Sequence, residues 1–83
     1  MQVTVKYFGL ASSQAGKREE VLTLPAGTNL ASLKSLLQTR YQLGTEVIVF
    51  FNLNGKGIAG SDMEHCQLSG GDVIMIIPQI SGG

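Results

Sequence analysis

The sequence predicts a small α+β domain, in which a mixed sheet of four or five strands carries one main helix on one of its faces. Residues 2–8 alternate between apolar and polar side chains, as expected of a strand with one buried face. Leucines recur at steps of three and four residues after Asn29, which is typical of an amphipathic helix. An apolar run at residues 73–77 indicates a strand that is buried on both faces, in the middle of the sheet.

Length and cysteine content indicate one domain without a disulfide framework. The 83 residues are 43% apolar, which argues against disorder, and a chain of this size buries roughly 60–65% of its unfolded surface. The single cysteine, Cys66, cannot form an internal disulfide or a multi-cysteine zinc site. Residues 1–6 lack the layout of a signal peptide, so we expect a cytoplasmic protein whose thiol stays reduced.

Charge and hydropathy argue against two further classes of protein. Six basic and six acidic side chains give a formal net charge of zero, whereas nucleic-acid-binding domains carry a basic excess. No apolar run approaches the ~20 residues that a membrane-spanning helix requires. We therefore expect neither a nucleic acid nor a membrane as a partner.

The first two strands are expected to pair as antiparallel neighbours. The second strand covers residues 19–24, with Glu20, Leu22 and Leu24 on one face and Val21 on the other. The small and polar residues 9–16 between the two strands are predicted to form a loop.

The main helix is expected to begin after a polar cap. Thr28 or Asn29 can accept a hydrogen bond from the exposed amides of the first turn. Gly44 is a C-terminal signal for this helix. Its apolar stripe, which we expect to face the core, consists of Leu30, Leu33, Leu36 and Leu37.

The second half of the chain is expected to supply the other strands. A strand at residues 46–53 must point the adjacent Phe50 and Phe51 to opposite faces of the sheet. Asn54-Gly55 is a turn signal, and the stretch from there to residue 68 is predicted to be irregular, with one short strand near Ile58. A tight turn at residues 69–72 then leads into the last strand.

This order of elements is that of the ubiquitin-like β-grasp, with the first and last strands side by side and the helix diagonal across one face. We expect a domain at residues 1–77 and a flexible tail, ending in Gly-Gly, at residues 78–83. The second face of the sheet would then be uncovered. One of Phe50 and Phe51, with part of the run at residues 74–77, would form an exposed apolar patch there, which is typical of a partner surface.

Two other groups of residues could suggest chemistry, but their patterns do not support it. His65 and Cys66 are adjacent, so their side chains rarely converge, and no further His or Cys completes a catalytic or metal site. The glycine-rich residues 55–60 lack the Gly-Lys-Ser/Thr ending of a phosphate-binding loop.

Four segments along the chain form a recognisable pattern: residues 3–8, residues 27–30, residues 68–73 and the ending Ile77-Pro78-Gln79-Ile80-Ser81-Gly82-Gly83. They resemble the small sulfur-carrier proteins, and especially the small subunit of molybdopterin synthase. The thiamine sulfur carrier is less similar, because it usually lacks a proline before the tail. The chain also differs from the synthase subunits: Gln79 follows Pro78 where a second proline is common, and the segment between Asn54 and Asp72 is longer.

The resemblance implies a carrier that is not catalytic by itself and binds no cofactor. An activating enzyme, similar to those that activate ubiquitin, would use ATP to adenylate the carboxylate of Gly83. A sulfurtransferase or desulfurase would then supply the sulfur that displaces AMP and leaves a thiocarboxylate. Gly82 and Gly83 suit this role because a β-carbon would crowd a narrow channel. The recipient would bind in the large subunit of molybdopterin synthase.

Pro78 is expected to end sheet pairing and release the tail, since proline has no amide hydrogen. The five residues after it could then reach about 16 Å into a partner. The residues expected to contact partners are Phe8, Phe51, Ile76, Pro78, Ile80 and Ser81.

Three alternatives stay open at this point. The sulfur could go to a thiazole, to cysteine or to a tRNA uridine. The chain could be a ubiquitin-like modifier that is joined through Gly83 to a lysine of another protein. It could also be a plain β-grasp interaction domain, although such a domain has no reason to end in Gly-Gly.

Overall fold

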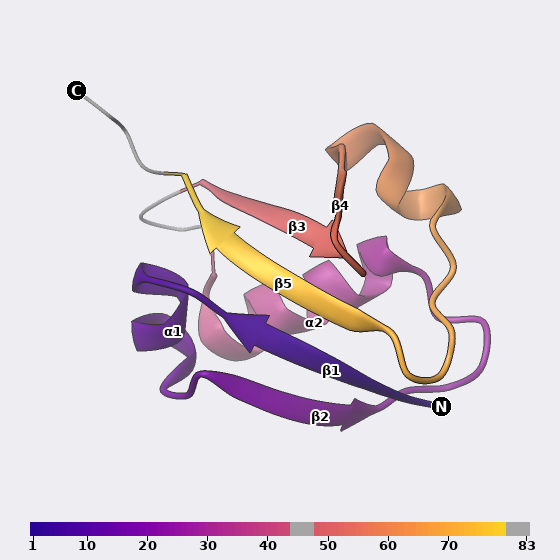
Figure 1. Cartoon of the computed structure of the whole chain (residues 1–83), viewed down its shortest axis with the longest axis horizontal. Helices are drawn as coiled ribbons and strands as arrows, with labels where there is room; N and C mark the ends of the chain where they lie inside the picture. Colours follow the sequence, from indigo (N-terminus) through magenta and orange to yellow (C-terminus); the bar gives the residue numbers. More distant parts are fainter. Residues whose placement is uncertain (44–47, 80–83) are drawn as a thin grey trace.

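The computed structural model describes residues 1–43 and 48–79. Within them, one five-stranded sheet has the order β2-β1-β5-β3-β4 (Figure 1). The first and last strands are therefore central neighbours, as the sequence predicts, and the fold is the expected β-grasp. The strands are β1 (Gln2–Tyr7), β2 (Glu19–Thr23), β3 (Val49–Leu53), β4 (Lys56–Ile58) and β5 (Val73–Pro78).

The two central strands run parallel, and every other neighbouring pair is antiparallel. The parallel pairing aligns Tyr7 with Ile76, and the β3–β5 pairing aligns Phe51 with Ile76. The third strand was predicted to start at residue 46, but β3 starts at Val49; residues 44–47 lie outside the described residues. The weak strand predicted near Ile58 is confirmed as β4.

The main helix, α2 (Leu30–Tyr41), begins at the predicted cap. The side chain of Asn29 accepts a hydrogen bond from the amide of Ser32 at 2.8 Å, which identifies Asn29 rather than Thr28 as the cap. At the other end Gln42 adopts a left-handed conformation, and its amide donates to the carbonyl of Gln38. The predicted signal at Gly44 lies outside the described residues.

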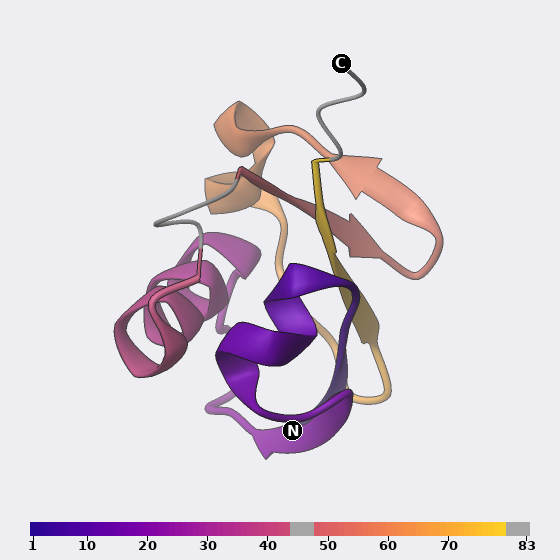
Figure 2. The same ribbon diagram turned by 90° about the vertical axis from the view of Figure 1, so that its left-hand side faces the viewer.

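The leucine stripe of α2 packs against one face of the sheet. Leu30, Leu33 and Leu37 are fully buried, and Leu36 is half-buried against the same core. In the side view of Figure 2, α2 lies to one side of β5 and of the β3–β4 hairpin, and no described helix lies on their other side. The sheet therefore has one covered and one open face, as predicted.

A second helix, α1 (Leu10–Ala15), occupies the segment that was predicted to be a loop. The prediction was wrong because Ala11 and Ala15, one turn apart, are both buried, and such small side chains allow the helix to lie close to β1 and β5. Gly16 closes the helix in a left-handed conformation, with its amide donating to Ser12 O at 2.9 Å.

The segment before the last strand is also more regular than predicted. It contains a 3-10 helix, η1 (Gly60–His65), which packs beside α2. Its one buried residue, Met63, extends the core beyond the end of the leucine stripe. A single apolar residue in a polar segment gives no periodicity, which explains why the sequence predicted an irregular stretch.

A network of hydrogen bonds fixes the start of β5. Asn54 and Gly55 both have positive φ, as the predicted turn between β3 and β4 requires. The Asn54 side chain donates to Asp72 Oδ1 at 2.9 Å and accepts from the amide of Val73 at 2.8 Å. Asp72 Oδ2 accepts from the amide of Ser69, which confirms the predicted tight turn. The hydrogen bonds thereby join the two turns at the end of the sheet where β5 begins (Figure 1).

None of the helices in the described part of the chain is long and apolar enough to span a membrane.

Candidate functional site

The candidate site is the end of the sheet at which β5 stops. There β5 lies beside the start of α1, with β3 on its other side (Figure 1). The predicted functional residues Ile80, Ser81, Gly82 and Gly83 follow directly and lie outside the described residues. The described part of the candidate site is therefore the surface around Pro78 and Gln79.

Pro78 ends the pairing of β5 with β1 but not its pairing with β3. The prediction that Pro78 releases the tail from the sheet was therefore wrong for the β3 side. Toward β3, Pro78 aligns with Val49, and the next amide, of Gln79, donates to Ile48 O at 2.7 Å. Toward β1, the amide of Phe8 donates to Ile76 O at 3.1 Å. The next bond of this parallel ladder would need an amide hydrogen at position 78, which proline lacks.

Gly9 abuts the same proline from the start of α1. Its φ of 53° and ψ of −131° lie in a region that residues with side chains rarely adopt. A β-carbon at Gly9 would lie 3.1 Å from Pro78 Cγ. Pro78 is therefore confined by β3 on one side and by the backbone of Gly9 on the other.

Two of the predicted partner contacts, Phe51 and Ile76, are wrong. They are only 1% and 0% exposed, because they pair across β3 and β5 on the face that α2 covers. The alternation of a strand places their neighbours Phe50 and Ile77 on the open face. There these two residues also form a register pair, 54% and 39% exposed. The choice between Phe50 and Phe51, which the pattern left open, is thus decided for Phe50.

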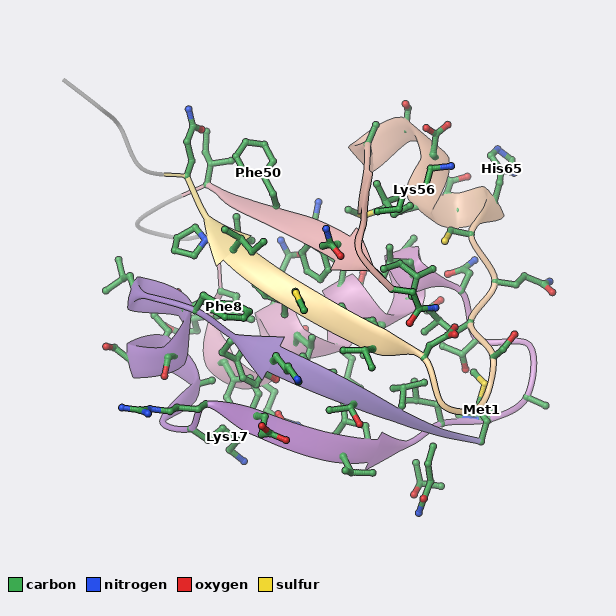
Figure 3. All side chains as sticks on the ribbon, in the orientation of Figure 1. Met1, Phe8, Lys17, Phe50, Lys56 and His65 are labelled. Carbon is green, nitrogen blue, oxygen red and sulfur yellow. The ribbon has the colours of Figure 1, made fainter. Side chains whose placement is uncertain are left out.

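Four exposed apolar side chains cross this end of the open face, and we call them the apolar row. Phe8 and Phe50 lie on opposite sides of β5 near its end (Figure 3). The prediction of an exposed apolar patch on the uncovered face is therefore correct for Phe50 and Ile77. Phe8, which was predicted as a partner contact, extends the patch on one side, and Ile48, which was not predicted, extends it on the other. The apolar row consists of Phe8, Ile77, Phe50 and Ile48.

An open hollow of about 570 Å³ adjoins the row at Phe8. Two of its lining side chains are cationic and one is anionic: Lys6 lies on β1, Arg18 directly precedes β2, and Glu19 is the first residue of β2. Sequence reasoning assigned no role to these residues, because charged side chains on exposed strands are usually solvated. The lining consists of Lys6, Tyr7, Phe8, Gly9, Ser12, Arg18 and Glu19.

A hydrogen-bonded cluster lies on the covered side of the same end of the sheet. One carboxylate oxygen of Glu20, Oε2, accepts hydrogen bonds from the hydroxyls of Tyr7 at 2.5 Å and Tyr41 at 2.8 Å. Lys17 Nζ lies 3.6 Å from the other oxygen, and 5.4 Å from the centre of the Tyr41 ring. We call Tyr7, Glu20 and Tyr41 the tyrosine–glutamate cluster. It joins β1, β2 and the last turn of α2.

The cluster shifts the pKa values of two of its members in opposite directions. Burial acts to raise the pKa of Glu20, but the hydrogen bonds from Tyr7 and Tyr41 and the charge of Lys17 outweigh it, so this pKa is lowered. Burial, with the hydrogen bond to Glu20, raises the pKa of the Tyr7 hydroxyl. Glu20 is therefore an anion at neutral pH, and it accepts two hydrogen bonds from hydroxyl groups. The inward position of Glu20 on its strand was the signal for this cluster in the sequence.

His65 and Cys66 lie far from this end of the sheet. His65 ends η1 at the opposite side of the molecule (Figure 3). Cys66 is half-buried, and its carbonyl accepts from the amide of Leu30 at 2.8 Å, which attaches η1 to the start of α2. Among residues 1–43 and 48–79, no group of three or more potential ligands could hold a metal ion.

The sequence matches the model of the ThiS family over residues 5–83, which includes the tail to its last residue. A search among curated proteins gives no match.

Solved structures share the whole fold. A putative molybdopterin converting factor subunit 1 from Pyrococcus furiosus is 26% identical, with a TM-score of 0.80 over 96% of this chain and 99% of that one. In a complex of subunits 1 and 2 of the molybdopterin-converting factor from Helicobacter pylori, the matching chain is 26% identical, with a TM-score of 0.70 and both chains covered completely. The small archaeal modifier protein 1 from Methanosarcina acetivorans is 25% identical, with a TM-score of 0.70 over 99% of this chain and 96% of that one.

Proposed function

We propose a function for this chain from one established premise, that it belongs to the ThiS family of small sulfur-carrier, ubiquitin-like proteins. The chain acts as a sulfur carrier through the carboxylate of Gly83. The observation that carries the proposal is the family match, which continues through Pro78 and the last two glycines. No described side chain takes part in the chemistry, which is supplied by partners.

The chemistry begins with activation, because a carboxylate is a poor electrophile. An oxygen of the Gly83 carboxylate attacks the α-phosphate of ATP in a partner enzyme, and pyrophosphate leaves. The product is an acyl-adenylate with AMP as a good leaving group. Hydrosulfide then adds to the carbonyl carbon, the bond to AMP breaks, and the resulting thioacid loses its proton to become the thiocarboxylate.

The surface around Pro78 supports a tail that is presented in one direction. The amide of Gln79 is bonded to Ile48, the residue before β3, so we take the carrier segment to begin at Ile80 and not directly after Pro78. The four residues from there to Gly83 can reach at most about 13 Å. The active site of a partner must therefore lie close to the apolar row. The apolar row would dock against the surface of that partner while the tail enters the active site.

We propose the dithiolene of the molybdenum or tungsten cofactor as the destination of the sulfur. The support is the similarity to two molybdopterin converting factor subunits, one of which was solved in complex with its subunit 2. The corresponding partner of this chain would be the large subunit of a molybdopterin synthase, with the apolar row in the interface.

A modifier function is the second candidate, and the similarity to the small archaeal modifier protein 1 favours it. Activation of Gly83 would be the same. The acyl group would then pass to a lysine amine of another protein, with an isopeptide bond as the product.

The test is reconstitution with the activating enzyme of the same host, ATP and sulfide. The wild type should release pyrophosphate and AMP and gain a thiocarboxylate, whereas a variant with one alanine added after Gly83 should do neither. Its melting temperature should be unchanged, since the buried core of the described structure is formed by residues 3–76. Equal activation of both proteins would overturn the proposal. Conjugates in cells that vanish when Gly83 is deleted would instead assign the modifier function.

A further inference from the structure

We propose that the hollow beside Phe8 binds a carboxylate on the surface of the enzyme that activates Gly83. This inference rests on the proposed function and adds the chemistry by which the partner is recognised. Adenylation of Gly83 comes before sulfur transfer to any recipient, and also before conjugation to a lysine. The activating enzyme is therefore a partner in both of the proposed functions.

The two cations of the hollow, Lys6 and Arg18, form no ion pair with any residue that the structure describes. Lys6 lies opposite Glu19 in the pairing of β1 with β2, but the two side chains do not form an ion pair. Arg18 also forms no ion pair within residues 1–43 and 48–79. The nearby Lys17, in contrast, is paired with Glu20. Two unpaired cations at one hollow attract an anionic group from outside the chain.

The hollow adjoins the apolar row and the end of β5, both of which a partner that receives the tail must contact. Phe8 lines the hollow and also belongs to the apolar row. Gly9 lines the hollow and abuts Pro78, the last residue of β5. An acidic side chain placed in the hollow would therefore fix a partner against the base of the tail.

The composition of the lining fits an acidic protein segment better than a free nucleotide. Two cations and the carboxylate of Glu19 leave one net positive charge, which matches a single carboxylate and not a triphosphate. The exposed ring of Phe8 provides an apolar wall for a neighbouring side chain of the same segment. The hollow is open, so a surface loop of a folded partner can enter it.

The experiment measures the KM and kcat of adenylation with the activating enzyme of the same host, with this chain as the varied substrate. Arg18→Glu and Lys6→Glu should each raise KM about tenfold with little change in kcat, and Arg18→Lys should stay near the wild type. Lys56→Glu is the matched control, because Lys56 is an exposed lysine on β4, far from Phe8 (Figure 3). Melting temperatures establish that all of the variants are folded.

Salt provides a second readout that a purely structural role would not change. The KM of the wild type should rise between 50 mM and 500 mM salt, and the KM of Arg18→Glu should rise much less. Activation of the wild type together with an unchanged KM of Arg18→Glu overturns the inference and leaves the proposed function intact. Failure of the wild type to be adenylated overturns both. Binding of ATP or AMP to the chain alone, lost in Arg18→Glu, would assign the hollow to a small anion and also overturn the inference.

Discussion

The two adjacent phenylalanines of β3 provide the sharpest test of which sheet face is core and which is partner surface. Phe51 is fully buried and aligned with Ile76, so Phe51→Ala leaves a cavity in the core. Such truncations cost about 3–5 kcal/mol, a large part of the 5–15 kcal/mol that typically stabilises a domain. Since 1 kcal/mol shifts the melting temperature of a domain this small by about 4–8 °C, we expect a loss of at least roughly 12 °C.

Phe50→Ala should have the opposite effect: it should change the stability little and weaken binding of the partner. Its ring is more than half exposed, so we expect a loss below about 1 kcal/mol in the free energy of unfolding. As a member of the apolar row, however, it should weaken binding of the activating enzyme by about 2 kcal/mol, which is a rise in Kd of roughly thirtyfold.

Urea unfolding and a binding titration with the activating enzyme measure the two effects separately. Val21→Ala is the control, because Val21 is an equally exposed apolar residue on β2, outside the apolar row, and both of its readouts should stay near the wild type. The reasoning is refuted if Phe50→Ala loses several kcal/mol of stability, or if it binds the enzyme as well as the wild type does.

Three further predictions concern the contacts that hold this frame together. Glu20→Gln should lower the free energy of unfolding at pH 7 by about 1–2 kcal/mol in urea titrations. The pKa of Glu20 is lowered below its usual value of 4.5, so the contribution of the carboxylate is complete above that pH. It is lost as the pH falls through the lowered pKa, so the variant and the wild type should converge as the pH is decreased below 4.5; a constant difference would contradict this. Asn54→Gly keeps the left-handed turn but removes two side-chain hydrogen bonds, and should cost about 1–2 kcal/mol in the same assay; a neutral result would show that the bonds to Asp72 and Val73 are dispensable. Asn29→Ala should cost about 1 kcal/mol and Asn29→Ser much less, and equal losses would argue against the cap.

The sheet and the main helix could be predicted because their signals are local. The alternation in β1, the leucine stripe of α2 and the Asn54-Gly55 turn each depend on neighbours within a few residues. The central position of β5 followed from an apolar run that is continuous on both faces. Helix α1 was missed because its buried face consists of two alanines, which carry little hydropathy signal.

The partner surface could be predicted only in part, because it depends on pairings between distant strands. The alternation of Phe50 and Phe51 was certain, but the choice between them depended on the β3–β5 register, which no local pattern gives. The continued pairing at Gln79 likewise depends on Ile48, a residue that is distant in sequence. The tyrosine–glutamate cluster joins three elements, and only the inward position of Glu20 hinted at it.

The intact mass of the protein, purified from its native host under reducing conditions, tests the central claim most directly. If Gly83 carries sulfur, part of the protein should be heavier by about 16 mass units, the replacement of one oxygen by sulfur. The extra mass should reside in the C-terminal peptide and disappear after alkaline hydrolysis. If Gly83 is found only as a carboxylate, even after incubation with the activating enzyme, ATP and sulfide, the chain is not a sulfur carrier.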